Sequence, residues 1–294
     1  MIDVKRKKKK KKKSQWPFIL IFILGLLVLL YPQVSRLYYR IDSKNVISNF
    51  DSEKEKLSTE EIKRRMELAK AFNESLHNVV TEDPYSDEKK KEGRAEYARM
   101  LEINEYIGHI QIPIIDVDVP MYAGTSEEVL QKGAGHLEGS SLPIGGINTH
   151  TVITAHSGLP TAKLFTDLSK VQIGDTFYIH NFAEILAYQV DQIKVIEPSE
   201  FDDLLIVKDK DYATLLTCTP YMINSHRLLV RGHRVEYVKE LVDREILEGK
   251  QNMVYMYLFY FAIFVVIILI ILTVYFVLKK RRLKKKLKNF SIND

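Results

Sequence analysis

The single cysteine of the chain, Cys218, lies in the segment Tyr212-Ala-Thr-Leu-Leu-Thr-Cys-Thr-Pro220. The apolar residues before it favour β-structure and predict a strand that ends close to the thiol, where a side chain can be aimed at a substrate. Because there is no second cysteine for a disulfide, this residue is either an inert buried side chain or a nucleophile. A thiol nucleophile needs a base close by and a group that stabilises an oxyanion.

Among the eight histidines, His156 shares the sequence context of the cysteine. It stands in Val152-Ile-Thr-Ala-His-Ser-Gly-Leu-Pro160, after an apolar β-prone run and before a glycine and a proline, which predicts a position at the rim of a sheet. A histidine there could serve the thiol as acid and base. Spacing alone also leaves three other histidines as candidates: His180, His226 and His233.

Two arginines follow the cysteine in His226-Arg-Leu-Leu-Val-Arg-Gly-His-Arg234. Side chains two apart along a strand point to the same face, so Arg227 and Arg231 are predicted to share one face. A guanidinium can aim several N–H donors at a developing oxyanion. The alternative interpretation is a solvated polar face on an edge strand.

Basic residues are concentrated at the two ends of the chain, in the unbroken run 5–13 and the cluster 279–288. They account for the formal net charge of +5, and the acidic part between them argues against a nucleic-acid-binding protein. The uncharged segments 14–35 and 253–278 lie beside these basic ends, and each is long enough to cross a bilayer. Without a small-residue cleavage pattern, the first is predicted to be an uncleaved anchor. The positive-inside rule then predicts a two-pass cell-membrane protein with both termini in the cytoplasm and 36–252 on the extracytoplasmic face.

The external segment has a helical first part and a β-rich second part. A capped helix is predicted over 58–73, the Asp83-Pro84 pair breaks the helical pattern, and 86–105 is again helix-like. From Tyr106 the pattern changes to short β-prone segments separated by turns, with one short helix expected over 162–171. Short strands of this kind predict a barrel or sandwich with the helices packed beside it. The predicted strands are 107–122, 149–154, 176–180, 184–196, 212–217 and 227–237.

Three motifs taken together resemble the sortases, the cysteine transpeptidases of the Gram-positive bacterial surface. They are Thr214-Leu-Leu-Thr-Cys218, Ala155-His-Ser-Gly158, and Arg227 nine residues after the cysteine. The segments 135–146 and 164–168 look like those of the pilus-building subgroup, class C. The resemblance implies a mainly β fold, a sortase-like closed β-barrel. It also implies that Cys218 is the nucleophile, His156 the acid and base, and Arg227 the group that binds the oxyanion and orients the substrate.

Two further features are similar to class C sortases. A C-terminal span accompanies the N-terminal one, and Asp83-Pro84-Tyr85 resembles the lid motif that plugs the active site of pilus sortases. In those lids the acidic residue pairs with the catalytic arginine, and an aromatic ring, usually Trp or Phe, covers the cysteine. The resemblance therefore implies a regulatory role for Asp83 and Tyr85, with a tyrosine ring as a small departure from the family pattern.

The predicted organisation follows from the membrane segments and the resemblance together. A helical N-terminal region carries the lid at 83–85, and the catalytic domain is the β-barrel. Along the chain, the expected parts are a cytoplasmic basic tail (1–13), an N-terminal anchor (14–35), the helical region (36–105), the barrel (106–237), a linker (238–252), a C-terminal transmembrane helix (253–278) and a second cytoplasmic basic tail (279–294).

The resemblance implies cleavage of Leu-Pro-x-Thr-Gly (LPXTG) sorting signals through a cysteine thioester, followed by transfer to a lysine of the next pilin. The expected partners are pilin precursors with such signals, an acceptor lysine and membrane lipid, with no nucleic acid. No cofactor is implied, and the sequence contains no metal-ligand cluster. Two alternatives stay open: a sortase that anchors surface proteins to the peptidoglycan cross-bridge, and a non-catalytic membrane-tethered barrel that binds surface proteins.

Overall fold

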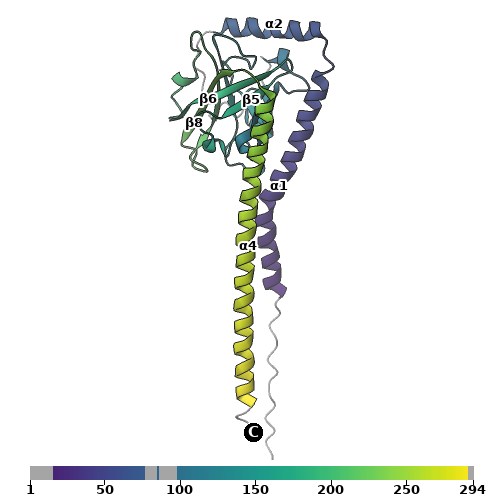
Figure 1. Cartoon of the computed structure of the whole chain (residues 1–294), viewed down its shortest axis with the longest axis vertical. Helices are drawn as coiled ribbons and strands as arrows, with labels where there is room; N and C mark the ends of the chain where they lie inside the picture. The colour runs from purple at the N-terminus through teal and green to yellow at the C-terminus, as the bar shows by residue number, and fades with distance from the viewer. Residues whose placement is uncertain (1–15, 77–84, 86–97, 291–294) are drawn as a thin grey trace, which may run out of the picture. The chain divides into compact units, whose positions relative to one another are not determined.

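The computed structural model describes residues 16–76, 85 and 98–290 of the chain. The chain divides into two compact units, Met1–Tyr237 and Val238–Asp294. The first unit contains all the strands of the described chain together with the helices that precede them (Figure 1). The second unit contains one long helix, α4 (Lys239–Phe290), which includes all but the first of the residues 238–252 predicted as a linker.

Eight strands close into a barrel in the order β1-β2-β3-β4-β7-β8-β6-β5. The pairs β2/β3 and β4/β7 are parallel, and the other neighbours are antiparallel. Closure pairs the backbone of every strand on both sides, which confirms the predicted mainly β barrel. The strands are β1 (Gly108–Ile112), β2 (Val117–Ala123), β3 (Ala134–His136), β4 (Thr149–Thr154), β5 (Thr176–His180), β6 (Ile185–Ile196), β7 (Asp211–Thr219) and β8 (His226–Val235).

The strand boundaries agree closely with the sequence pattern. β4 and β5 match the predicted ranges residue for residue, and β6, β7 and β8 differ from prediction by one or two residues at their ends. The predicted strand 107–122 is instead two strands. Pro113–Ile115 forms a short 3-10 turn, and Asp116 takes a φ of 50°, so the chain reverses and β2 pairs with β1.

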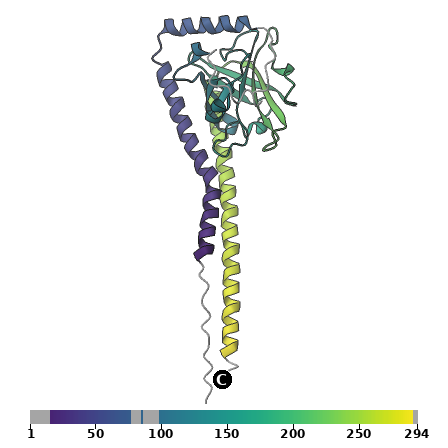
Figure 2. The ribbon, with the colours of Figure 1, turned by 180° about the vertical axis from the view of Figure 1, so that it is seen from behind.

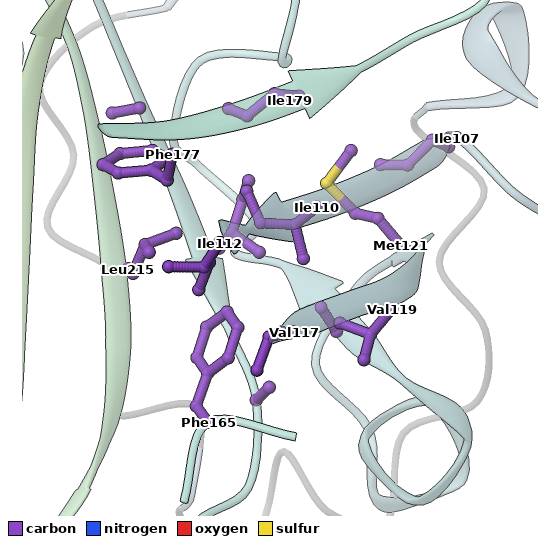
Figure 3. Close-up of a cluster of buried hydrophobic side chains, with 14 of the residues drawn as sticks. Ile107, Ile110, Ile112, Val117, Val119, Met121, Phe165, Phe177, Ile179 and Leu215 are labelled. Atoms are coloured by element: carbon purple, nitrogen blue, oxygen red, sulfur yellow. The ribbon is translucent and has the colours of Figure 1, made fainter. Parts of the chain in front are cut away.

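Apolar side chains from most of the strands fill the barrel, and Figure 3 shows a group of them converging, ten of which are labelled. Residues on β1, β2, β5 and β7 contribute because alternate side chains of a strand point to the same face. On β7 this alternation sends Leu215 into the interior, while Leu216 and Cys218 belong to a second buried cluster. The labelled interior residues are Ile107, Ile110, Ile112, Val117, Val119, Met121, Phe165, Phe177, Ile179 and Leu215.

Among the described residues, two α-helices precede the barrel, α1 (Trp16–Lys54) and α2 (Thr59–Ser75), and α2 and the C-terminal part of α1 lie next to it in the two views of Figures 1 and 2. The predicted capped helix is confirmed as α2: the Ser58 side chain accepts a hydrogen bond from the Glu61 backbone N–H at its first turn. The C-terminal half of α1 contacts the barrel. Arg40 is ion-paired with Asp116 at 2.6 Å, and the Tyr39 hydroxyl donates to the Lys132 carbonyl oxygen.

Two local predictions differ from the structure. The short helix expected over 162–171 is a series of turns that ends in a 3-10 turn, Leu168–Lys170, because Leu164 has a φ of 38° that an α-helix does not accommodate. The sequence pattern also missed β3 and the six-residue helix α3 (Glu127–Lys132) between β2 and β3. This helix is the crossover that lets β2 and β3 run parallel.

The two apolar segments predicted as membrane spans, 14–35 and 253–278, fall largely within α1 and α4. Within the residues that the structure describes, no helix combines the length and hydropathy needed to cross a membrane. The two membrane spans therefore stay predictions.

Candidate active site

Cys218 and Arg227 lie directly opposite each other on neighbouring strands. They are register partners in the antiparallel pair of β7 and β8, so their Cβ atoms are about 5 Å apart. Two backbone carbonyl groups just before Arg227 hold its guanidinium: Arg227 Nη1 donates to the carbonyl oxygens of Asn224 and His226, each at 3.1 Å. Both side chains are buried, with 7% of Cys218 and 6% of Arg227 exposed.

His156 reaches the same place from β4, which runs parallel to β7. Thr154 is the register partner of Leu216, and the next residue, Ala155, donates its N–H to the Leu216 carbonyl oxygen. Two residues further along each strand are His156 and Cys218, so parallel pairing brings them side by side. The loop after His156 is held in turn, because the Phe165 N–H donates to the His156 carbonyl oxygen at 3.1 Å.

The structure thus gathers the three residues that the sequence pattern singled out, one from each of three adjacent strand ends. The other candidate histidines lie elsewhere. His180 is on β5, where its ring stacks on that of His109 at 4.1 Å, and His233 lies opposite Tyr212 on β8. His226 is opposite Thr219, and its Nε2 is 3.1 Å from Glu197. Arg231 lies on the Arg227 face, as predicted, but is paired with Asp191 at 2.9 Å.

Tyr85 occupies the space over this group. Its ring centroid is 5.6 Å from that of His156, the Arg227 guanidinium carbon is 5.1 Å from it, and Tyr85 belongs to the same buried cluster as Cys218. The Tyr85 hydroxyl donates to the Ala155 carbonyl oxygen at 2.8 Å. Because its one proton is used there, the Thr154 hydroxyl is the donor in the 2.7 Å contact between their oxygens. The other lid residue predicted from the sequence, Asp83, lies outside the described residues.

The surroundings of Tyr85 keep it in its neutral form. Burial raises the pKa of the Tyr85 hydroxyl, and negative charge on Cys218 raises this pKa further, against opposing contributions from the neighbouring threonines and Arg227. A hydroxyl that stays protonated remains a donor to Ala155 throughout the physiological pH range. The same carbonyl oxygen also accepts from the Thr217 hydroxyl at 2.7 Å.

Apolar side chains line the sheet beside the thiol. Leu216 lies two residues before Cys218 on the same face of β7, and Leu229 on β8 is the register partner of Leu216. Ile196 and Leu204 belong to the same buried cluster. An extended apolar peptide segment placed next to the thiol would contact these residues. The sequence alone did not identify them, because they come from four separate elements: β6, β7, β8 and the 3-10 turn Asp202–Leu204.

One neighbour of His156 was missed by the sequence analysis. Glu127, the first residue of α3, places its carboxylate Oε2 at 3.3 Å from His156 Nε2. No local pattern marks this glutamate, because it lies in a short helix that the sequence did not predict and is far from His156 along the chain.

Comparisons with known proteins agree with this geometry. A family model described as a sortase domain matches residues 110–235. Sortase C-1 of Streptococcus pneumoniae is 70% identical in sequence and superposes with a TM-score of 0.65, over 66% of this chain and all of that one. The chain belongs to the sortase family.

Other sortases extend the comparison. The pilus-related sortase C of Group B Streptococcus is 62% identical with a TM-score of 0.61, over 64% of this chain and 96% of that one. Sortase A of Bacillus anthracis is 26% identical over 137 residues, which is 46% of this chain and 62% of that protein. The chain thus spans less than two thirds of this sortase A. Class C pilus sortases are its structural neighbours, and the family consists of cysteine transpeptidases.

Proposed function

We propose that this protein is a pilus-assembly sortase that cuts LPXTG-type sorting signals and joins the released acyl group to a lysine of another pilin subunit. The observation that carries the proposal is the register of the three strand ends, where Cys218 faces Arg227 across β7 and β8 and His156, two residues after the end of β4, lies beside Cys218. A thiol, an imidazole and a guanidinium at one place are the groups that acyl transfer through a thioester requires.

The first half-reaction forms the thioester. The Cys218 thiolate attacks the carbonyl carbon of the signal's threonine, and the N–H groups of Arg227 stabilise the oxyanion of the tetrahedral intermediate. When the Thr–Gly bond breaks, His156 gives a proton to the departing glycine amine. The products are a Cys218 thioester of the pilin and a free C-terminal fragment that begins with glycine.

The second half-reaction consumes the thioester. The ε-amine of the acceptor lysine attacks the thioester carbonyl, His156 takes a proton from the attacking amine, and the Cys218 thiolate leaves. The product is an isopeptide bond between two subunits. The thioester keeps the acyl group activated, so the transfer to lysine needs neither ATP nor a cofactor.

In this proposal Tyr85 is part of a lid over the site. Its ring lies against His156 and Arg227, and its hydroxyl bonds to the strand end that carries His156. A sorting signal and this ring would compete for the same space next to Cys218. We assign Asp83 to the lid on the family resemblance alone, with Arg227 as its expected partner. A closed lid would protect the thiol and its thioester from water and unscheduled substrates.

The choice of a pilin lysine as acceptor rests on the class C neighbours of known structure and on the lid-like segment. Anchoring to the membrane through 14–35 and 253–278, with the barrel on the extracytoplasmic face, rests on the uncharged composition of these segments and the basic runs beside them. Enzyme and membrane-bound pilin precursor would then meet within one surface, which raises their effective concentration.

The test is intact-mass analysis of the full chain in detergent, as it occurs and with Tyr85→Ala, after incubation with an LPXTG peptide. A mass increase equal to the acyl fragment, absent in the Cys218→Ala variant, would support the thioester. Addition of a lysine-bearing pilin domain should then remove the adduct and produce a pilin of matching added mass.

Other outcomes separate the alternatives. An adduct that is discharged by a cross-bridge peptide but not by the pilin would indicate a cell-wall-anchoring sortase. No adduct in either form of the protein, with Cys218 still reactive toward a small thiol reagent, would favour a barrel that binds surface proteins without catalysis.

A further inference from the structure

Glu127 holds its carboxylate between its own helix and the ring of His156. Its Oε2 atom is 3.3 Å from His156 Nε2, and its Oε1 atom accepts a hydrogen bond from the side-chain amide of Gln131, 2.5 Å away. Gln131 lies one turn further along α3. One carboxylate oxygen is therefore hydrogen-bonded to Gln131 and the other lies at ion-pair distance from the imidazole, while 38% of the Glu127 side chain remains exposed.

The helix that carries Glu127 is itself firmly placed. The Ser126 side chain caps it by accepting from the Val129 N–H, and Ser126 is buried. Val129 and Leu130 are buried as well, in the cluster that contains Cys218. Because α3 links the parallel strands β2 and β3, its first residue has little freedom to move away from the end of β4.

The contact has a consequence for the two nitrogens of the imidazole. A carboxylate next to Nε2 favours a proton on that nitrogen, which leaves Nδ1 to exchange a proton with the thiol or the substrate amine. Glu127 from α3 and Tyr85 contact the His156 ring, and Cys218 from β7 and Arg227 from β8 lie at the neighbouring strand ends. Two of these residues, Glu127 and Cys218, can carry negative charge near the imidazolium, and one, Arg227, is a cation.

The charges change during the proposed reaction. Once the thiolate has attacked, its charge passes to the oxyanion, which pairs with Arg227. The imidazolium then still has to hold its proton until the glycine amine departs. A fixed carboxylate at Nε2 offsets the imidazolium charge at this stage, when the thiolate no longer does.

We infer that Glu127 is a positioning residue for His156. The Glu127 carboxylate orients the imidazole through Nε2 and stabilises the protonated form of His156 during acyl transfer. The inference rests on the proposed function for its role in transfer, whereas the pairing of Glu127 with His156 can be measured without any substrate.

The first measurement is an NMR titration of the full chain in detergent, with histidine labelled at ¹³Cε1 and the His156 signal assigned by its loss in His156→Gln. In Glu127→Gln the titration midpoint of His156 should move to lower pH by about one unit, because an opposite charge at this distance favours the charged form. The matched control is Glu128→Gln. It removes the same charge from the next residue, which pairs with Lys132 instead, and it should leave the midpoint in place.

The second measurement is the pH profile of kcat/KM for transpeptidation, taken in a Tyr85→Ala background so that the lid does not limit entry. In Glu127→Gln the part of the pH profile that reports protonation of His156 should move to lower pH by the same amount as the NMR midpoint. In Glu127→Asp, which keeps a carboxylate, the move should be smaller. Gln131→Met keeps the negative charge of Glu127 but removes the amide that donates to Glu127 Oε1, so it should give a smaller shift in the same direction.

The outcomes distinguish this inference from the proposed function. An unchanged His156 midpoint in Glu127→Gln, with transpeptidation intact, would overturn the inference alone. A shifted midpoint in a protein that forms no thioester would leave the pairing in place and contradict its role in transfer. Equal shifts in the Glu127→Gln and Glu128→Gln variants would also overturn it, because they would reflect net charge and not the contact.

Discussion

The Tyr85 hydroxyl donates a hydrogen bond to the carbonyl oxygen of Ala155, 2.8 Å away, at the residue that precedes His156. The tyrosine is thereby tied to the backbone of the strand end that carries the imidazole, in addition to its ring contact with His156. A phenylalanine or tryptophan at this position could not make this bond to Ala155 through a hydroxyl. The tyrosine hydroxyl therefore adds a polar contact to the packing of the ring against His156.

The first prediction concerns this hydroxyl. Tyr85→Phe keeps the ring but removes both hydrogen bonds of the hydroxyl, to Ala155 and from Thr154, and at about 1 kcal/mol for each bond the accessible fraction of the thiol should rise about 5- to 30-fold. Tyr85→Ala should have a larger effect. The measurement is the second-order rate constant for alkylation of Cys218 by a neutral reagent. Tyr221→Phe, the same change on an exposed tyrosine of the β7–β8 loop, is the control, and an equal rise there would refute the prediction.

The second prediction concerns the guanidinium opposite the thiol. Arg227→Lys keeps the positive charge but loses the planar set of donors that the Asn224 and His226 carbonyls orient. The kcat of transpeptidation should fall roughly 100- to 1,000-fold, as for loss of an oxyanion donor. Alkylation of Cys218 should change only a few fold, since it forms no oxyanion. The matched control is Arg231→Lys, on the same strand face but paired with Asp191, which should retain most of the activity.

Much of the fold could be predicted because its strands are continuous β-prone runs bounded by turns. β4 and β5 have alternating or apolar sequences and end where the pattern ends. β3 could not be found, because Ala-Gly-His has no strand preference and becomes extended only by pairing with β2 and β4. The turn at Leu164 was equally hidden, since leucine rarely adopts a positive φ and its sequence gives no sign of one.

The site could be predicted only in part, for a related reason. Cys218 and His156 each follow an apolar run at a strand end, and Arg227 follows the cysteine along the chain, so each has a local signature. Their meeting depends on the parallel pairing of β4 with β7, which the sequence does not indicate. Glu127 has no signature of its own and comes close to His156 only through α3.

The third prediction is a loss of stability in acid. Burial lowers the pKa of His136 and of His150 to about 4, whereas an unfolded histidine titrates near 6.5. Between these values the unfolded chain binds more protons than the folded one, so the free energy of unfolding should fall as pH drops below about 6.5. At pH 4.5 the loss should be about 2 to 3 kcal/mol for each histidine.

Urea unfolding between pH 7.5 and 4.5 measures this loss. His150 accepts from the Thr214 hydroxyl and donates to the Leu205 carbonyl oxygen, which fixes its neutral form. In His150→Gln the slope of the unfolding free energy against pH should therefore decrease by about one bound proton. An unchanged slope would show that His150 does not contribute to the acid sensitivity.

The fourth prediction separates stability from activity in the barrel interior. Phe165 and Phe177 are both fully buried in the cluster of Figure 3. Only Phe165 also donates its backbone N–H to the His156 carbonyl oxygen. Either Phe→Ala change should lower the free energy of unfolding by about 3 to 5 kcal/mol, through lost burial and the cavity left behind. Phe165→Ala should in addition loosen the loop after His156. Transpeptidase activity per folded molecule, measured at low temperature in the Tyr85→Ala background, should fall in Phe165→Ala and stay near the parent value in Phe177→Ala. Equal activities at equal stability would mean that the interior supports the barrel but does not position His156.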